Sequence, residues 1–382
     1  MNSTISEEQL QELSLPSLAA QFAQLVDQRC ARGRRYALVP LLVLWLLAKL
    51  CGEDHPTGIA EWVAHRQAWL CEGLALAWRR MPHAATWRRL LAQDLAVAAL
   101  EELAGAFLQR LSESPEAVLN LDGKTLRGTI AAGASHGLHL LAVQAQHSQC
   151  VWAQQAVMTK ENEIRVAPQL LAGVALQGKV VTADALHTQQ ALSRQIVEAG
   201  GDYLWRVKEN QPTLYAQLQQ AFATPPPRDA ETAQTLEKGH GRIEARRVTS
   251  SAQVSARLSW PYVSQAFRLQ RTVTDCRTGQ VREETAYGIT SLAPLAAGPE
   301  RLLAVARGHW SIENGLHYRR DVTFREDACR MKSHRAAQVL AVFNNLALGL
   351  LRTAGWQNLA AARRYYQAHL AEALALITKP FR

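Results

Sequence analysis

Residues 118–124 read VLNLDGK, and residues 179–184 read KVVTAD. Each stretch is a short apolar run that ends in an aspartate, which is typical of a buried strand followed by a turn. A helical pattern covers about residues 163–176, between the two runs. Carboxylates at the ends of neighbouring strands can meet at one edge of a sheet, so these two stretches predict both the core of the fold and a candidate site.

The stretches around these two runs alternate between strand and helix patterns. Further strands are expected at about 138–147, 150–158 and 203–207, and further helices at about 188–199 and 213–222. Three strands followed by alternating helices and strands predict an α/β fold with a sheet of mixed direction.

The flanking regions divide the chain into four expected segments. Residues 1–112 read as helices and form a helical N-terminal domain, which is a candidate for binding DNA ends, and 113–223 is the first part of the α/β core. Three prolines at 225–227 open a β-rich insertion at 224–296, since proline continues neither a helix nor a central strand. Helical patterns at about 335–353 and 358–377 lie in the last segment, 297–382.

Composition excludes several classes of protein. Hydrophobic residues make up 48% of the 382 residues, which is enough for two or three packed domains and excludes wholesale disorder. The longest uncharged apolar run, 36–48, has 13 residues, whereas a membrane span needs roughly 20. The N-terminus lacks a secretory pattern, and six scattered cysteines form no Cys-x-x-Cys pair. We therefore expect a cytoplasmic protein with reduced thiols and no membrane partner.

The charge balance indicates an anionic partner. The formal net charge is +9, and only eight of the 42 basic residues are lysine. Arginine suits phosphate because its planar guanidinium forms paired hydrogen bonds with phosphate oxygens. The arginine preference of a GC-rich genome explains the composition equally well.

Three acids stand out by position. Asp122 and Asp184 follow strands, and Glu313 lies in a predicted helix, in HWSIEN at 309–314. A cluster of carboxylate oxygens suits Mg²⁺, and two such ions can activate the attacking oxygen and stabilise the leaving oxygen of a phosphodiester. The alternative for Asp184 is an ordinary cap on a helix that begins near Leu186.

Five stretches, in order along the chain, resemble the DDE-type insertion-sequence transposases of the H-repeat-associated (ISAs-type) group. They are LNLDGKTLRGT at 119–129, VVTADALHTQ at 180–189, YLWRVKENQPTLY at 203–215, GHGRIEARRV at 239–248 and HWSIENGLHYRRDVTFREDACRMK at 309–332. The N-terminal pattern GRRYALVPLLVLWLLAKLCG at 33–52, with GIAEWVAHR at 58–66, extends the resemblance over nearly the whole chain.

The resemblance implies an RNase H-like catalytic core interrupted by a β-rich insertion. It implies that Asp122, Asp184 and Glu313 bind Mg²⁺ or Mn²⁺ and cleave transposon ends before strand transfer to target DNA. It further implies double-stranded DNA as the partner, with terminal inverted repeats and target DNA bound by a dimer on DNA, in a bacterial cytoplasm at the nucleoid. The same acids would serve an RNase H-like nuclease without strand transfer, and an inactive or domesticated derivative would only bind DNA.

Several basic residues are candidates for phosphate contact. In related transposases, basic residues one turn before and two turns after the glutamate contact DNA, and the matching positions here are His309 and Arg320. The chain departs from the group at Arg320, where the group is often apolar, and at Ala306, where more distant relatives often have tyrosine. The other candidates are Lys208 and the basic stretch Lys238, Arg242, Arg246 and Arg247.

Other residues have ordinary alternatives. Glu326 and Asp327 could compete with Glu313 as the third carboxylate, or one of them could pair with a neighbouring arginine. His187 could orient substrate, cap a helix or lie at the surface. The ten tryptophans are expected to pack in the core and between helices rather than to stack on bases.

Overall fold

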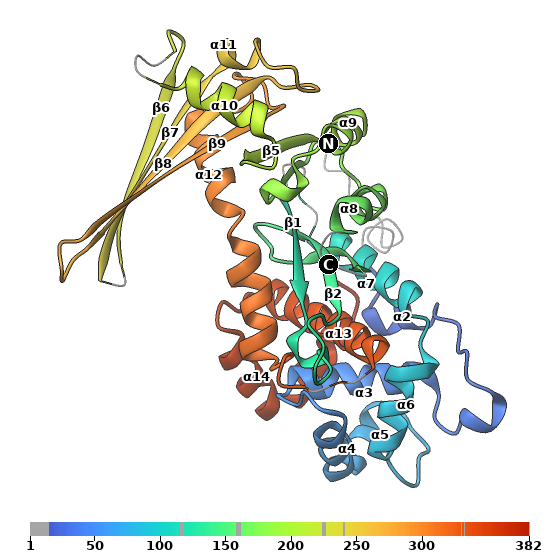
Figure 1. Ribbon diagram of the computed structural model, residues 1–382. Helices are drawn as coiled ribbons and strands as arrows, with labels where there is room; N and C mark the ends of the chain where they lie inside the picture. Colours follow the sequence, from blue (N-terminus) through green and yellow to red (C-terminus); the bar gives the residue numbers. More distant parts are fainter. Residues whose placement is uncertain are drawn as a thin grey trace, which may run out of the picture.

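The computed structural model describes residues 15–112, 114, 118–157, 162–223, 227–239, 241–329, 331 and 333–381. The segment boundaries that we expected at 113 and 224 lie outside these residues. Figure 1 shows the arrangement, with a long β-ribbon on one side and a body of helices on the other.

The described strands form one nine-stranded sheet in the order β3-β2-β1-β4-β5-β9-β8-β7-β6. The strands β1, β4 and β5 run parallel, and the remaining pairs are antiparallel, so the predicted mixed direction is confirmed. Their bounds are β1 Val118–Thr125, β2 His139–Ala145, β3 Val151–Val157, β4 Val180–Ala183, β5 Asp202–Val207, β6 Glu231–Gly239, β7 Arg242–Ser251, β8 Gln265–Asp275 and β9 Val281–Thr290.

Helices cover the core of the sheet, which explains why its parallel strands are almost wholly apolar. Helix α8 (Glu163–Ala172) packs on β2 and β3, α9 (Gln190–Glu198) packs on β5, and α7 (Val97–Leu111) packs on β3. The close approach of α7 requires Gly105, because a Cβ there would collide with the carbonyl oxygen of Trp152. Helix α10 (Pro212–Ala221) packs on β8 and β9.

The helices before and after the core pack together into one helical body. The apolar run that we expected to be buried forms α3, which packs against α13, α14 and α15 from the other end of the chain. The helix bounds are α2 Leu18–Phe22, η1 Ala31–Gly33, α3 Leu38–Leu50, α4 Pro56–His65, α5 Gln67–Gly73, α6 Ala84–Arg89, η2 Leu90–Asp94, α13 His334–Thr353, α14 Leu359–Ala368 and α15 Leu370–Thr378. None of the helices in the described part of the chain is both long and apolar enough to cross a membrane.

Strands β6–β9 form the antiparallel ribbon that projects in Figure 1. The ribbon continues the core sheet, because β9 pairs directly with β5. Helix α12 (Pro299–Gly308) packs on β6 and β7 and buries an apolar layer against the ribbon, with Val248, Phe267 and Leu302 among its members. The strand pattern at 242–248, 267–273 and 284–289 was predicted, but β6 was not, because its outer half is polar and exposed.

Candidate active site

The parallel pair β1–β4 sets the position of the two aspartates. Asn120 and Thr182 are direct partners in this pair. Two residues further along, Asp122 lies in β1 just beyond its last residue paired with β4, and Asp184 directly follows β4, so both reach the same end of this strand pair. The strand that we expected to end at Asp122 continues to Thr125 and stays paired with β2. Asp122 and Asp184 both line one cavity of about 650 Å³, together with Lys208. The structure therefore brings together three of the side chains that the sequence singled out.

The carboxyl group of Asp122 is hard to ionise in this cavity. Burial, followed by the nearby carboxylate of Asp184, raises its pKa from the ordinary 3.8 to about 7. The charges of Glu163 and Glu313 add to this rise, and the backbone N–H of Gly123 opposes it. A cation bound here would relieve the repulsion between Asp122 and the neighbouring acids. The carboxylate oxygens therefore form a donor set that fits a hard divalent metal.

Glu313 lies on the helical segment that follows α12. This segment contains two π-helical stretches, η6 (Glu313–His317) and η7 (Arg319–Thr323), and Glu313 begins the first of them. Such stretches occur frequently at functional sites. The carboxylate of Glu313 is exposed and raises the pKa of Asp122. Within the described residues, however, no three His, Cys, Asp or Glu side chains are grouped closely enough to hold one ion.

A buried hydrogen-bond network joins the two strands to the helical segment of Glu313. The Thr182 hydroxyl donates to Oδ1 of Asn120 at 2.8 Å and lies 3.0 Å from Nδ1 of His309. The Asn120 amide donates to the Ser311 hydroxyl at 2.9 Å. Because these residues lie two to four positions from the three acids, the network fixes the acids relative to one another.

Two histidines flank Glu313 at four residues on either side, and each lies beside one aspartate. Nε2 of His309 is 3.9 Å from Oδ1 of Asp184, and Nδ1 of His317 is 3.5 Å from Oδ2 of Asp122. Burial is the main cause that lowers their pKa values, to about 4 for His309 and about 3 for His317. Both rings are therefore neutral at neutral pH. His309 is 6% exposed, so it contacts Thr182 and approaches Asp184 instead of presenting a cation to DNA as we expected.

A second cluster of titratable residues, which the sequence did not predict, lies beside Asp122. The Glu163 carboxylate is 2.8 Å from Nε2 of His139 and 3.1 Å from Nε2 of His187. Burial would raise the pKa of Glu163, but the hydrogen bonds from the two histidines outweigh it and lower the pKa to about 2. Gly123 leaves room for this cluster, since a Cβ there would lie 2.8 Å from the Glu163 carboxyl carbon and collide with His139.

The contacts of His187 and Asp184 exclude some of the roles that the sequence left open for them. His187 is 1% exposed and binds Glu163, so it is neither a surface residue nor a helix cap. Asp184 begins a short 3₁₀ turn, η5 (Ala185–His187), but its side chain makes no capping hydrogen bond. The ordinary explanation for Asp184 therefore fails, and its carboxylate remains 54% exposed in the cavity.

The structure corrects the prediction that Arg320 contacts DNA. Its side chain is 1% exposed, and its Nε donates to both carboxylate oxygens of Glu326, at 3.0 and 2.9 Å. The prediction assumed an α-helix, in which positions 313 and 320 share a face. A π-helical turn holds more residues than an α-turn, so this segment directs Arg320 into the core. Glu326 is therefore a structural partner of Arg320 and no substitute for Glu313.

The remaining candidates are Asp327 and the three arginines of β7. Asp327 accepts a hydrogen bond from the backbone N–H of Arg127, and its carboxylate lies 3.9 Å from Nζ of Lys124. Strand alternation places Arg242 and Arg246 on one face of β7, with Glu244 between them, and Arg247 on the opposite face. Arg247 therefore does not share the face of Arg242 and Arg246, and DNA contact by all three stays a prediction.

In this mixed sheet Asp122 lies in β1 just beyond the part paired with β4, Asp184 directly follows β4, and Glu313 lies on a following helical segment, an arrangement of the RNase H-like type. A family model described as "Transposase DDE domain" matches residues 113–350, and a second, described as "DDE_Tnp_1-associated", matches residues 19–108. The first match covers more than half of the chain, which therefore belongs to the DDE transposase family. It is a DDE-domain transposase of an insertion sequence.

The chain is similar to individual proteins of known sequence, and two of the following three are named as putative transposases. "Uncharacterized protein in dhlA 3'region" of Xanthobacter autotrophicus is 32% identical over 65% of this chain and 85% of its own length. "H repeat-associated putative transposase YhhI" of Escherichia coli K12 is 28% identical over 63% of this chain and 65% of its own. "Putative transposase YncI" of Escherichia coli O157:H7 is 26% identical over 89% of this chain and 88% of its own.

The chain is also similar to solved structures. The piggyBac transposase synaptic complex with hairpin DNA aligns with a TM-score of 0.46 and 8% identity, over 95% of this chain and 77% of that chain.

Asp122→Asn should stabilise the metal-free protein in a pH-dependent manner. Asp122 ionises near pH 7 in the folded protein but near 3.8 when unfolded, so folding loses stability as the pH rises between these values. Asparagine does not ionise, so the variant does not lose this stability as the pH rises. The gain should grow from pH 4 to 7 and then stay constant, reaching at most about 4 kcal/mol at roughly 1.4 kcal/mol per pKa unit. Denaturant unfolding in chelator measures it, and a gain that is independent of pH would contradict the assignment.

Arg320→Ala and Glu326→Ala should each destabilise the fold by about 3–5 kcal/mol, because each leaves a buried charge without its partner. The double variant Arg320→Met/Glu326→Met should lose less than either single variant. Arg165→Ala, on the exposed face of α8, is the control and should change stability by less than about 0.5 kcal/mol. Equal effects of Arg165→Ala and Arg320→Ala on denaturant midpoints would mean that Arg320 is exposed in solution.

Proposed function

We propose that this transposase cuts the ends of its element and joins them to target DNA at one centre formed by Asp122, Asp184 and Glu313. The observation that carries the proposal is the position of Asp122 and Asp184 side by side in one cavity. The pKa of Asp122, which burial and Asp184 raise, supports a site built to receive a cation. We include Glu313 in the centre because its negative charge also raises the pKa of Asp122.

DDE transposases generally use a divalent metal, and the donor set here fits Mg²⁺ or Mn²⁺. Asp122, Asp184 and Glu313 would hold the metal through carboxylate oxygens, which hard cations prefer. When bound, divalent metal supplies activation of an attacking oxygen and stabilisation of a leaving oxygen at a phosphodiester.

The chain's own residues prepare this centre. His309 and His317 lie beside Asp184 and Asp122, and their lowered pKa values, caused mainly by burial, keep both rings neutral. Neutral histidines orient the carboxylates without cancelling the negative charge that a metal needs. The exposed ammonium of Lys208 lines the same cavity and would bind a phosphate of the substrate strand.

The proposed partner is double-stranded DNA, both the terminal inverted repeats and the target. Arg242 and Arg246 would contact phosphate from the face of the ribbon that looks toward α12. Two element ends must be brought together for joining, so we propose that two copies of the chain assemble on DNA. Cleavage without joining would instead identify an RNase H-like nuclease, and binding without cleavage an inactive derivative.

Asp122→Ala, Asp184→Ala and Glu313→Ala should each lower cleavage more than about 100-fold, because each removes stabilisation that acts in the transition state. DNA binding should change little. The substrate is a donor plasmid that carries the gene with its natural flanking DNA, and gel analysis separates cut from joined products. Glu61→Ala, an exposed acid on α4, is the control. Near wild-type cutting by any folded triad variant would remove that residue from the centre.

Cleavage and joining should require Mg²⁺ or Mn²⁺. Ca²⁺ should bind without supporting cleavage, because its larger and looser coordination sphere misplaces the reacting oxygens. The same plasmid assay with each cation, and with excess chelator, measures this requirement. Undiminished cleavage in chelator would overturn the metal-dependent proposal.

A further inference from the structure

Strand pairing does not fix the position of Asp184 relative to Asp122. The pairing between β1 and β4 ends at Leu121 and Ala183, one residue before the two aspartates. Beyond that point Asp122 stays in the sheet because β1 still pairs with β2, whereas Asp184 leads into the 3₁₀ turn η5. The distance between the two carboxylates, which repel each other, therefore depends on contacts made by η5.

The side chain of Glu163, the first residue of α8, connects η5 to the strands beside it. Its Oε2 is 3.1 Å from Nε2 of His187, the last residue of η5, and its Oε1 is 2.8 Å from Nε2 of His139, the first residue of β2. Nδ1 of His139 lies 2.8 Å from the hydroxyl of Thr125, its partner on β1. One carboxylate therefore bridges η5 and the β1–β2 pair. We call His139, Glu163 and His187 the Glu163 clamp.

The Glu163 clamp is part of the wall of the candidate site. Its three side chains are buried, and Glu163 and His187 line the same cavity as the two aspartates. The absence of a side chain at Gly123 leaves space for the clamp, because a Cβ there would lie 2.8 Å from Oε1 of Glu163. Among the described residues, Nδ1 of His187 has no hydrogen-bond partner. The hydrogen bond to Glu163 therefore orients this ring.

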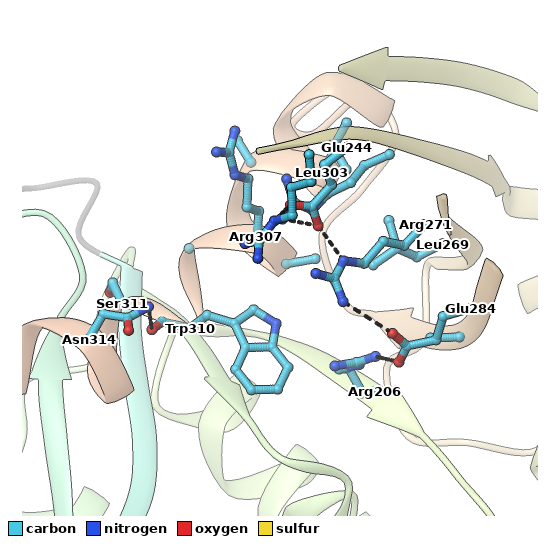
Figure 2. A pocket seen from close by; sticks show the side chains of 16 residues that line it. Arg206, Glu244, Leu269, Arg271, Glu284, Leu303, Arg307, Trp310, Ser311 and Asn314 are labelled. Carbon is cyan, nitrogen blue, oxygen red and sulfur yellow. Dashed lines mark hydrogen bonds and ion pairs between the residues drawn. The ribbon is translucent and has the colours of Figure 1, made fainter. Parts of the chain in front are cut away.

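Histidines hold Glu163 without placing a fixed positive charge beside the aspartates. Figure 2 shows the alternative in a neighbouring cavity of about 710 Å³, where Glu284 pairs with Arg206 and Arg271. A guanidinium is always protonated in proteins and would repel a metal ion. An uncharged imidazole can donate from Nε2 and accept at Nδ1, and the contact of His139 with a hydroxyl fits this tautomer.

We propose that Glu163 is a positioning residue of the metal centre, which holds η5 through His187 and thereby keeps Asp184 within reach of the ion that Asp122 binds. The inference rests on the proposed function and adds a residue that acts through its neighbours. Without the Glu163 clamp, repulsion between the aspartates would move Asp184 away from Asp122, and the ion would lose a ligand.

The ionisation of Glu163 supports this role. Burial opposes ionisation, but the hydrogen bonds from His139 and His187 outweigh it and lower the pKa of Glu163 to about 2. The carboxylate therefore stays ionised at neutral pH and accepts both hydrogen bonds.

Mn²⁺ binding to the protein without DNA, followed by electron paramagnetic resonance of the free ion, tests the inference without cleavage. The double variant Asp122→Ala/Asp184→Ala measures binding elsewhere on the chain, which is subtracted. Glu163→Ala should weaken the remaining binding by about ten-fold or more, as is typical when a group that orients metal ligands is removed. In the plasmid assay, the Mn²⁺ concentration for half-maximal cleavage should rise by the same factor, while the rate at saturating Mn²⁺ stays close to that of the wild type.

Two variants of His187 separate positioning from general stability. His187→Ala removes the connection to η5 but leaves Glu163 paired with His139, so it is the variant to use if Glu163→Ala does not fold. It should weaken Mn²⁺ binding to a similar extent. His187→Gln places an amide N–H near the position from which Nε2 donates, and it should restore most of the affinity.

Glu101→Ala on α7 is the matched control. Glu101 also accepts hydrogen bonds from two side chains, those of Gln154 and Gln338, but it lies outside the cavity. Its replacement should leave Mn²⁺ affinity unchanged.

Unchanged Mn²⁺ affinity in a folded Glu163→Ala or His187→Ala variant, or an equal loss in Glu101→Ala, would overturn the inference and leave the transposase proposal intact. A wild-type protein that binds no more Mn²⁺ than the double aspartate variant would contradict the proposed metal centre itself.

Discussion

The contact on which the candidate centre depends is a buried hydrogen bond between two strand partners, Asn120 and Thr182. The register of β1 and β4 places these polar side chains opposite one another in a sheet that is otherwise apolar here. Buried polar groups must be satisfied, so the pair continues to His309 and Ser311 on the helical segment. These buried hydrogen bonds hold the three elements that carry the acids in place relative to one another, which apolar packing alone does not do.

The acids near this hydrogen-bond network differ in how their negative charge is balanced. The carboxylates of Asp122 and Asp184 repel each other in the cavity, and the histidines beside them are too buried to carry charge. By contrast, the buried carboxylate of Glu163 is fully matched by His139 and His187. The repulsion between Asp122 and Asp184 is what a site that receives a cation requires.

The sequence predicts the parts of this arrangement that depend on local pattern. The apolar runs correctly place Asp184 directly after β4, and the mixed sheet follows from the order of the elements. They place Asp122 at the end of a strand, whereas β1 continues to Thr125 and only its pairing with β4 ends before Asp122. The prediction fails where the backbone departs from the α-helical repeat. At Arg320, the π-helical turns direct the side chain into the core. The sequence pattern also cannot show Glu163 beside Asp122, since only the folded chain brings α8 to the end of β1. The placement of Arg247 on the opposite face from Arg246 could have been predicted from the sequence, because side chains alternate along a strand.

The central claim is that Asp122, Asp184 and Glu313 act as one metal-binding centre. Anomalous diffraction from crystals of the protein with DNA and Mn²⁺ tests this directly, because it locates the metal without relying on activity. The account predicts manganese within about 2–2.5 Å of carboxylate oxygens of Asp122 and Asp184, with Glu313 brought into the same coordination sphere. Manganese bound elsewhere, or a DNA complex in which Glu313 stays apart from the two aspartates, would contradict it.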